Sequence, residues 1–139
     1  MGPVSTTKAS LRIFGDDLDP DEITRALGMP PTKARRKGEP FRNEDTGAEG
    51  VARHNGWWLR AEDRTPGDLD GQVRELLGVL TEDLSVWADI SSRCERLDMF
   101  CGLFLGEDNQ GETLSPDTLQ ALGARNIELG LDIYGPEQG

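Results

Sequence analysis

Histidine and cysteine are scarce in this sequence, and their scarcity removes several kinds of catalytic and metal site. The 139 residues include one histidine, His54, and two cysteines, Cys94 and Cys101. Zinc sites built from cysteine and histidine need four ligands at short spacings, which these residues do not supply. His54 lies in the polar segment VARHNGWW, just before an apolar run. We therefore expect a solvated loop side chain rather than a catalytic base.

The two cysteines are expected to remain free thiols. Both fall in the segment RCERLDMFCGLFL, which we interpret as one β-strand. Their separation in such a strand is about 23 Å at ~3.3 Å per residue, whereas a disulfide needs Cα atoms within about 7 Å. Free thiols are typical of a reducing compartment, so we predict a cytoplasmic protein.

Long apolar runs and glycine-rich phosphate loops are missing as well. No stretch approaches the ~18 apolar residues of a membrane helix, and the polar start MGPVSTTKAS lacks the apolar segment of a secretory signal. The 17 glycines form neither GxGxxG nor GxxxxGK[ST]. We expect no cofactor and assign no catalytic residue. A metal-dependent enzyme that uses the acidic loops at Asp16, Asp17, Glu107 and Asp108 stays open as an alternative.

Charge is unevenly distributed along the chain, whose formal net charge is −11. Residues 32–60 carry seven cations against four anions, so the rest of the chain is more acidic than the total suggests. An acidic overall field disfavours generic binding to the phosphate backbone of nucleic acids. It still allows a local anion site within the basic segment.

Two segments of the chain repeat one pattern. LRIFGDDLDPDEITRALG (11–28) and LFLGEDNQGETLSPDTLQALG (103–123) each run from an apolar strand end through Gly and two acids into a helix that ends in Leu-Gly. Asp19 and Ser115 are good N-cap residues, and the prolines after them fit the first helical position. The closing glycines fit a helix C-terminus. We interpret the pattern as an internal repeat of strand–helix–strand units, with both helices on the same side of one sheet.

Alternating apolar residues predict five strands, and apolar residues at helical spacing predict the helices between them. The expected strands are 10–15, 32–38, 56–62, 96–105 and 127–135, and the expected helices are 20–28, 69–80, 84–90 and 116–123. This order predicts an α+β two-layer sandwich, with a mostly antiparallel sheet and helices on one face. A ferredoxin-like arrangement built from the internal strand–helix–strand repeat is the most specific form of the prediction.

The chain has the length of one domain. We expect residues 1–8 to form a flexible N-terminus, residues 9–134 the single α+β domain, and residues 135–139 a flexible C-terminus. A polar segment, EPFRNEDTGAEGVARHN (39–55), separates the second and third strands. Loops of this length are often functional or disordered.

The ordered motifs of the chain resemble one known family. LRIFGDDLDPDEITRALGMPPTKARRKGE, the later GWW, and the closing LSPDTLQALGA and IELGLDIYG resemble the bacterial family catalogued as domain of unknown function 4279. The resemblance covers roughly residues 9–134. It implies a small cytoplasmic bacterial domain without assigned activity, some of whose members resemble immunity-type or accessory binding proteins. It carries no catalytic residue over to this chain, and Trp58 departs from it where a smaller or polar residue is expected.

The acidic loops of the two repeats are weak candidates for a metal site. GDDLDPDE begins like an EF-hand loop, but Glu22 and Gly28 stand where that loop needs Gly and Glu. Helix capping already explains Asp19 and Glu22. We therefore expect no tight divalent site, and the residues considered for a weak one are Asp16, Asp17, Glu107 and Asp108.

The segment MPPTKARRKGEP (29–40) forms a basic island in this acidic chain. In an extended strand, Lys33, Arg35 and Lys37 share one face, and Arg36 lies on the other. One interpretation is an edge strand whose charges prevent pairing with other chains. The other is a recognition surface for an anionic partner.

An outward-facing tryptophan next to the island favours the second interpretation, because a ring can stack on a base, another ring or an arginine. We predict a non-enzymatic binding or interaction module with an unidentified protein partner and no membrane partner. A nucleic-acid-associated domain using the same strand is the alternative, although no RNP-like aromatic pair is present. The candidate binding residues are Lys33, Arg35, Lys37, Trp58 and Arg60.

Overall fold

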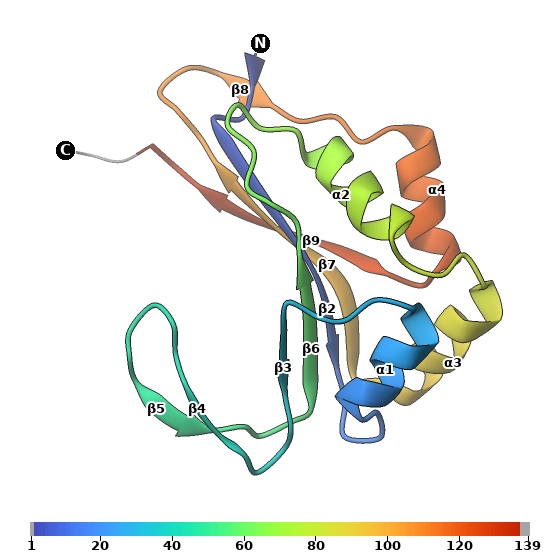
Figure 1. Cartoon of the computed structure of the whole chain (residues 1–139). Helices are drawn as coiled ribbons and strands as arrows, with labels where there is room; N and C mark the ends of the chain where they lie inside the picture. The colour runs from blue at the N-terminus through green and yellow to red at the C-terminus, as the bar shows by residue number, and fades with distance from the viewer. Residues whose placement is uncertain (1, 137–139) are drawn as a thin grey trace.

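In the computed structural model, which describes residues 2–136, the helices cover one face of a five-stranded sheet (Figure 1). The strands of this sheet lie in the order β3-β6-β2-β7-β9. Their bounds are β2 (Thr6–Phe14), β3 (Lys33–Arg35), β6 (Gly56–Arg60), β7 (Arg96–Phe104) and β9 (Glu128–Tyr134). The helices are α1 (Pro20–Leu27), α2 (Leu69–Gly78), α3 (Leu84–Arg93) and α4 (Pro116–Ala124).

The sheet is mixed rather than purely antiparallel. The pairs β3–β6, β6–β2 and β2–β7 are antiparallel, and β7–β9 is parallel. The parallel pair arises because the chain leaves β7, crosses the sheet through α4 and returns beside the same strand. The first crossover, through α1, leaves a gap of one strand, which β6 later fills. The fold is therefore α+β with helices on one face.

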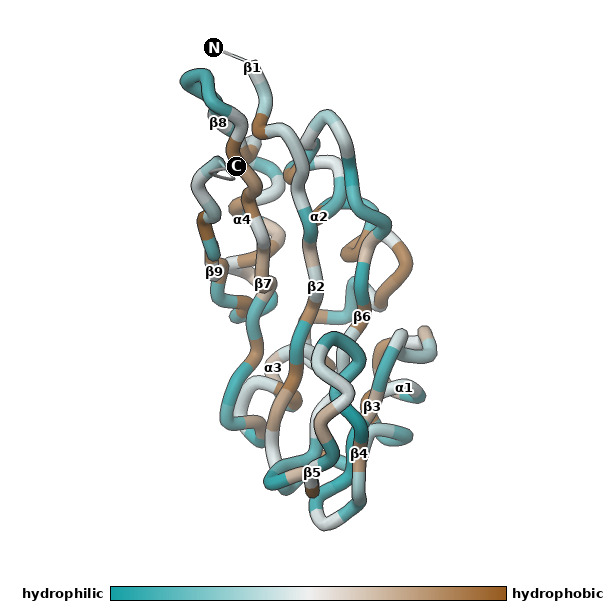
Figure 2. The backbone as a smooth tube through the Cα atoms, turned by 90° about the vertical axis from the view of Figure 1, so that its left-hand side faces the viewer, coloured by the Kyte–Doolittle hydropathy of each residue, from teal (hydrophilic) through white to brown (hydrophobic). Residues whose placement is uncertain are grey.

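The core lies between the sheet and the helices because side chains alternate along each strand. In β2, Ala9, Leu11 and Ile13 are buried. In β6, Trp57 is fully buried, and its ring N–H donates to the Thr24 hydroxyl of α1 at 3.1 Å. The alternate residues of these strands point to the opposite face, which no helix covers (Figures 1 and 2).

The helix caps follow the sequence closely. The Asp19 carboxylate accepts from the Asp21 backbone N–H at 2.8 Å, and Gly28 ends α1 with a left-handed φ of 82°. Ser115 caps α4 in the same way. Gly123 does not end α4, which continues to Ala124 before Asn126 takes the left-handed conformation. Glu22 does not close a capping box either, because it pairs with Arg93 instead.

Two small two-stranded sheets lie outside the main one. β1 (Gly2–Pro3) pairs with β8 (Gln110–Gly111), and β4 (Pro40–Arg42) pairs with β5 (Glu49–Val51). The expected flexible start at residues 1–8 therefore contains β1 and the beginning of β2 over its described part, with Val4 and Thr7 buried. The expected loop 39–55 contains the β4–β5 hairpin. Of the expected flexible end at 135–139, residues 137–139 lie outside the described residues.

The two repeated segments lie in positions that suit a twofold relation. β2 and β7 pair antiparallel along their full length, from Thr6 opposite Phe104 to Phe14 opposite Arg96. An antiparallel pair has a local twofold axis at its centre, and α1 and α4, which follow these strands, lie on the same face (Figure 1). The two helices therefore lie on one side of the sheet, as expected.

The outer strand β9 extends beyond the helices. Leu129 packs against the core, but Leu131 and Ile133, on the same face, are exposed. The alternation of apolar residues in 127–135 puts Leu131 and Ile133 on the side of the sheet that carries the helices. It does not indicate that the helices end before they reach these two residues.

Neighbouring tryptophans in β6 test the two-faced sheet. Trp57→Ala should lower the free energy of unfolding by about 3–5 kcal/mol, because it empties a fully buried site. The matched Trp58→Ala change, on the open face, should cost less than about 2 kcal/mol. Denaturant unfolding measures both, and equal losses would contradict the assignment of the two faces.

Candidate functional site

The uncovered face of the sheet carries a hollow of about 540 Å³ beneath the tip of the β4–β5 hairpin. Figure 2 looks onto this face, with the hairpin in front of the sheet and the helices behind it. We call the hollow the open-face groove. Its cationic side chains come from three strands: Lys8, Arg12, Lys33, Arg35 and Arg60. Its rings are Trp58, Phe100, Phe104 and Tyr134, and its acids are Glu44, Asp45 and Asp63.

Aromatic rings hold the cations of the groove. The Lys33 ammonium lies 4.4 Å from the centre of the Trp58 ring, which forms a T-shaped pair with Phe14 at 5.1 Å between ring centres. The Arg35 guanidinium lies 3.6 Å from the Phe41 ring and 5.4 Å from Trp58. Cation–π contacts of this kind position a charge without neutralising it. The rings therefore hold Lys33 and Arg35 in place without supplying an opposite charge.

Neither of these two cations has an acidic partner within the described residues. No carboxylate oxygen of residues 2–136 lies within 4.0 Å of the nitrogens of Lys33 or Arg35. In contrast, Arg60 pairs with Glu44 at 3.6 Å, and Lys8 pairs with Asp63 at 3.3 Å. The centre of the groove thus holds an excess of positive charge.

The pKa of Lys33 reflects this excess. Partial burial lowers it from the ordinary value, repulsion from Arg35 and Arg60 lowers it further, and attraction from Glu44 and Asp45 opposes the fall. Desolvation and like charges therefore oppose the charge of Lys33 in the folded protein, and its contact with the Trp58 ring favours it.

Arg12 has a structural role at the border of the groove. It donates two hydrogen bonds to the carboxylate of Asp98 on β7, at 2.9 and 2.7 Å, and stacks 4.2 Å over Phe100. Asp98 is buried and also accepts from Arg96 at 3.2 Å. A buried carboxylate needs such partners. The guanidinium of Arg12 is therefore used to join β2 to β7.

The basic island divides into two pairs with different roles. The strand ends at Arg35, and the chain turns at Gly38, so the expected alternation stops. Arg36 reaches the N-terminus of α1, where it pairs with Asp19 at 3.2 Å and Asp21 at 2.8 Å. Lys37 pairs with Asp16 at 3.2 Å and lies outside the groove. Of the predicted binding residues, the structure brings together Lys33, Arg35, Trp58 and Arg60, but not Lys37.

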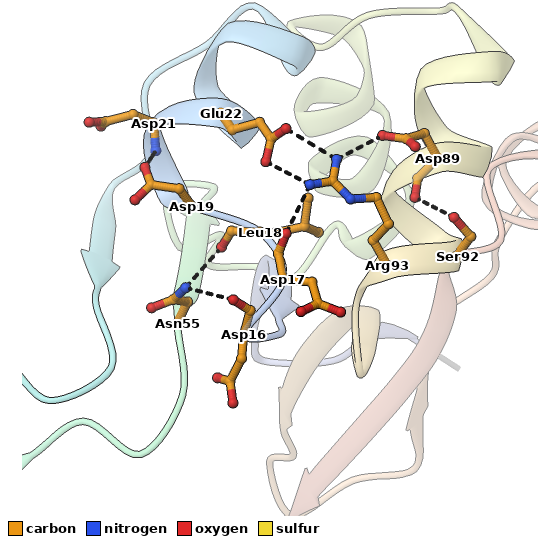
Figure 3. Close-up of polar contacts among 10 residues, drawn as sticks. All are labelled: Asp16, Asp17, Leu18, Asp19, Asp21, Glu22, Asn55, Asp89, Ser92 and Arg93. Atoms are coloured by element: carbon orange, nitrogen blue, oxygen red, sulfur yellow. Dashed lines mark hydrogen bonds and ion pairs between the residues drawn. The ribbon is translucent and has the colours of Figure 1, made fainter.

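The acidic loop after β2 is occupied by internal contacts (Figure 3). The guanidinium of Arg93 on α3 donates to both oxygens of Glu22, to Asp89 and to the Asp17 carbonyl. The Asn55 amide donates to the carbonyls of Asp16 and Leu18. Hydrogen bonding from Arg36 lowers the pKa of Asp19. These contacts explain most of the acidic side chains without a metal ion.

The two acidic loops cannot form one site. Both follow strands that run antiparallel, so Asp16 and Asp17 lie at one end of the β2–β7 pair, and Glu107 and Asp108 lie at the other. The ends are separated by the length of these strands, roughly 27 Å at ~3.4 Å per residue. A shared metal site between the repeats is therefore excluded by topology.

One cluster of possible metal ligands does occur among the described residues. Donor atoms of Asp16, His54 and Glu95 lie within 4.8 Å of one another, on exposed side chains. His54 Nδ1 is 3.4 Å from Asp16 and 3.7 Å from Glu95. The nearer carboxylate already binds the Lys37 ammonium. The contacts of this cluster are accounted for as a network of surface ion pairs.

The two thiols are free and unsuited to nucleophilic chemistry. Cys101 is buried in β7, and burial raises its pKa to about 12. Cys94 was expected in the same strand, but it lies at the C-terminal cap of α3. Burial raises its pKa as well. A nucleophilic cysteine needs a lowered pKa.

Part of the groove lies outside the residues predicted from the sequence. Lys8 and Arg12 belong to it because β2 lies beside β6, and the alternation in SLRIFG could have placed Arg12 opposite Leu11 and Ile13. Phe41 and the hairpin tip gave no comparable signal. Their position depends on how the segment 39–55 folds back over the sheet.

Comparison with known protein families matches residues 5–136 to the family described as Domain of unknown function (DUF4279). The chain belongs to this family. No curated protein and no solved structure matches the chain. Among the described residues, no helix is long and apolar enough to cross a membrane. The function of this DUF4279 member must therefore be inferred from its own groove.

The charge of Lys33 gives a testable consequence. Its pKa is lowered in the folded protein, so the charged form costs stability below the folded pKa, and this cost fades as pH rises through that pKa. Lys33→Met keeps the apolar stem and should leave Tm unchanged or raise it at neutral pH. Lys37→Met, which removes an ion pair, should leave Tm unchanged or lower it. A fall of several degrees in Lys33→Met would show that Lys33 has a structural role.

Metal titration tests the account of the acidic loop. Micromolar calcium, magnesium or zinc should change Tm by less than about 1 °C, since a ligand stabilises only a native state that binds it. Thermal unfolding with and without a chelator makes the comparison. A rise of several degrees that disappears in Asp16→Asn would require a metal site at Asp16, His54 and Glu95.

Proposed function

We propose that this protein is a non-enzymatic binding module that holds a carboxylate-rich segment of a partner protein in the open-face groove. One observation carries the proposal: Lys33 and Arg35 are seated on aromatic rings and have no acidic partner among residues 2–136. Unpaired, partly buried cations are unfavourable for folding. A ligand that supplies the missing carboxylates accounts for them.

The chemistry of the groove suits carboxylates. A guanidinium presents a planar fork of N–H groups that matches a carboxylate with two hydrogen bonds. Arg35 is held by Phe41 on one side, and the low exposure around Lys33 strengthens its interaction with a charged ligand. The rest of the molecule is acidic, so the groove stands out as the attractive region for an anionic surface and steers its approach.

Nucleic acid is the second candidate, since cations and aromatic rings share one open sheet face. The arrangement of the rings favours a protein instead. Trp58 carries Lys33, Phe100 carries Arg12, and Phe104 is stacked on Tyr134 at 4.5 Å. Rings covered in this way offer little surface for stacking bases, and the net charge of −11 repels a long polyanion.

The wider setting of this binding role is also a proposal. An immunity-type or accessory protein acts by holding a protein partner, which agrees with a groove lined by cations and aromatic rings. The two free thiols suit a reducing, cytoplasmic setting.

The scaffold of the groove has a ferredoxin-like character in this proposal. Strands β7-β2-β6-β3 are antiparallel neighbours, and α1 and the α2–α3 pair each connect strands separated by one position. This is the pattern of a split βαβ repeat. The α4–β9 unit is then an addition at the edge, and it contributes Tyr134 to the groove.

Neutralising the unpaired cations tests the proposed function. A fluorescein-labelled hexaglutamate peptide should bind the protein with an anisotropy change that weakens as salt increases. Lys33→Gln with Arg35→Gln should weaken binding about tenfold or more and flatten the salt dependence, because both central charges are removed. The unfolding midpoint should stay close to that of the unmodified protein.

Arg25→Gln with Arg74→Gln provides the matched control. It changes the net charge equally, but both residues lie on the helical side, on α1 and α2. An equal loss of affinity in the control would indicate attraction without a defined site. A dodecauridine oligomer that binds more tightly than the peptide, and depends on Lys33 and Arg35, would favour the nucleic-acid alternative.

A further inference from the structure

The tip of the β4–β5 hairpin places two carboxylates at the groove. Asn43, Glu44 and Asp45 line the hollow, and Glu44 pairs with Arg60 at 3.6 Å. The charges of Glu44 and Asp45 also act on Lys33, where they oppose the fall in its pKa. An acidic element of the chain itself therefore lies beside the cations that the proposed function assigns to a ligand.

The tip is a preformed turn rather than a loose loop. The Asn43 side-chain oxygen accepts from the backbone N–H groups of Asp45 and Thr46 at 2.8 and 3.1 Å. The Asn43 backbone N–H donates to the Ala48 carbonyl at 2.8 Å, and Gly47 takes a left-handed φ of 73°. Such an Asx-turn fixes the backbone of the tip. It presents Glu44 and Asp45 together as a small acidic unit.

The β4–β5 hairpin is a small sheet separate from the main one. β4 and β5 pair only with each other. At the base, the Gly38 N–H donates to Ala52 at 2.8 Å, and the Ala52 N–H donates to Glu39 at 2.9 Å. At the tip, Glu44 forms an ion pair with Arg60, and both side chains are exposed. Exposed pairs of this kind are weak, so the tip can leave the groove without unfolding the sheet.

We infer that Glu44 and Asp45 are an internal occupant of the open-face groove, which an acidic turn of the partner protein displaces. The inference rests on the proposed function and adds the form of the ligand: two adjacent carboxylates presented by a turn, as in the hairpin itself. Charge complementarity supports this occupant, because the groove already accommodates such a pair beside Arg60. The unpaired Lys33 and Arg35 provide two further positions that the internal tip does not fill.

An internal occupant reduces the apparent affinity of the groove, since only the fraction of molecules with the tip displaced is free to bind. Removing the charges of the tip should therefore strengthen the binding of an external acidic peptide. Glu44→Gln with Asp45→Asn keeps the shape of the turn, because Asn43 makes its hydrogen bonds. We expect this variant to bind fluorescein-labelled hexaglutamate at least about threefold more tightly than the unmodified protein.

Glu107→Gln with Asp108→Asn is the control, because it removes the same two charges from the exposed loop at the far end of β7. NMR of the unmodified protein should also show the amide signals of Glu44 and Asp45 moving as hexaglutamate is added. Tighter binding in the tip variant and not in the control, together with these shifts, supports the inference.

Other results separate the two proposals. If neutralising Lys33 and Arg35 abolishes peptide binding but the tip variant binds like the control, the groove is the site and the internal-occupant inference is wrong. If the tip and control variants both gain equally, the gain is a net-charge effect, and the inference is again wrong. If hexaglutamate binds none of the folded proteins, the proposed function itself fails, and the inference fails with it.

Discussion

The structure depends on a single layer of helices that covers only one face of a five-stranded sheet. Every strand residue on the second face must therefore be stable in contact with water. β2 and β7 meet this requirement with Arg12 and the buried Asp98, whose two hydrogen bonds tie the central strands together under Phe100. Trp58 meets it by covering its ring with Lys33. Cations stacked on rings thus cover the apolar surface of this face, and they also make it electropositive.

An acidic chain with a basic island is explained by where the island's charges go. Arg36 and Lys37 turn back to the acidic loop after β2, where they hold the N-terminus of α1 and the Asp16 cluster in place. Lys33 and Arg35 lie within the strand and point to the opposite side, away from those acids. The same short segment thus neutralises one surface and charges another. The division follows from the end of β3 at Arg35, after which alternation no longer applies.

Much of the fold was predictable because it is encoded locally. Caps such as Asp19 and Ser115 and the alternation around Trp57 depend on residues near each other in the chain. The order of the strands depends on pairing across long separations, and the parallel β9 could not be distinguished from an antiparallel strand by its pattern. Trp58 and Arg60 were predictable members of the site, because alternation sets their face. Phe41 and the hairpin tip were not, since a polar segment gives no periodic signal for how it folds back.

The groove arises from a difference between the chain that follows α1 and the chain that follows α4. β2 and β7 both lie in the interior of the sheet, and their antiparallel pairing sends the acidic loops after them to opposite ends. After α1, the chain leaves room for β6 and then carries the hairpin back over the open face. After α4, the chain returns directly beside β7 and places Tyr134 against Phe104. Among the described residues, the connection after α1 brings both unpaired cations and an acidic tip to the same place, so this connection sets the position of the groove.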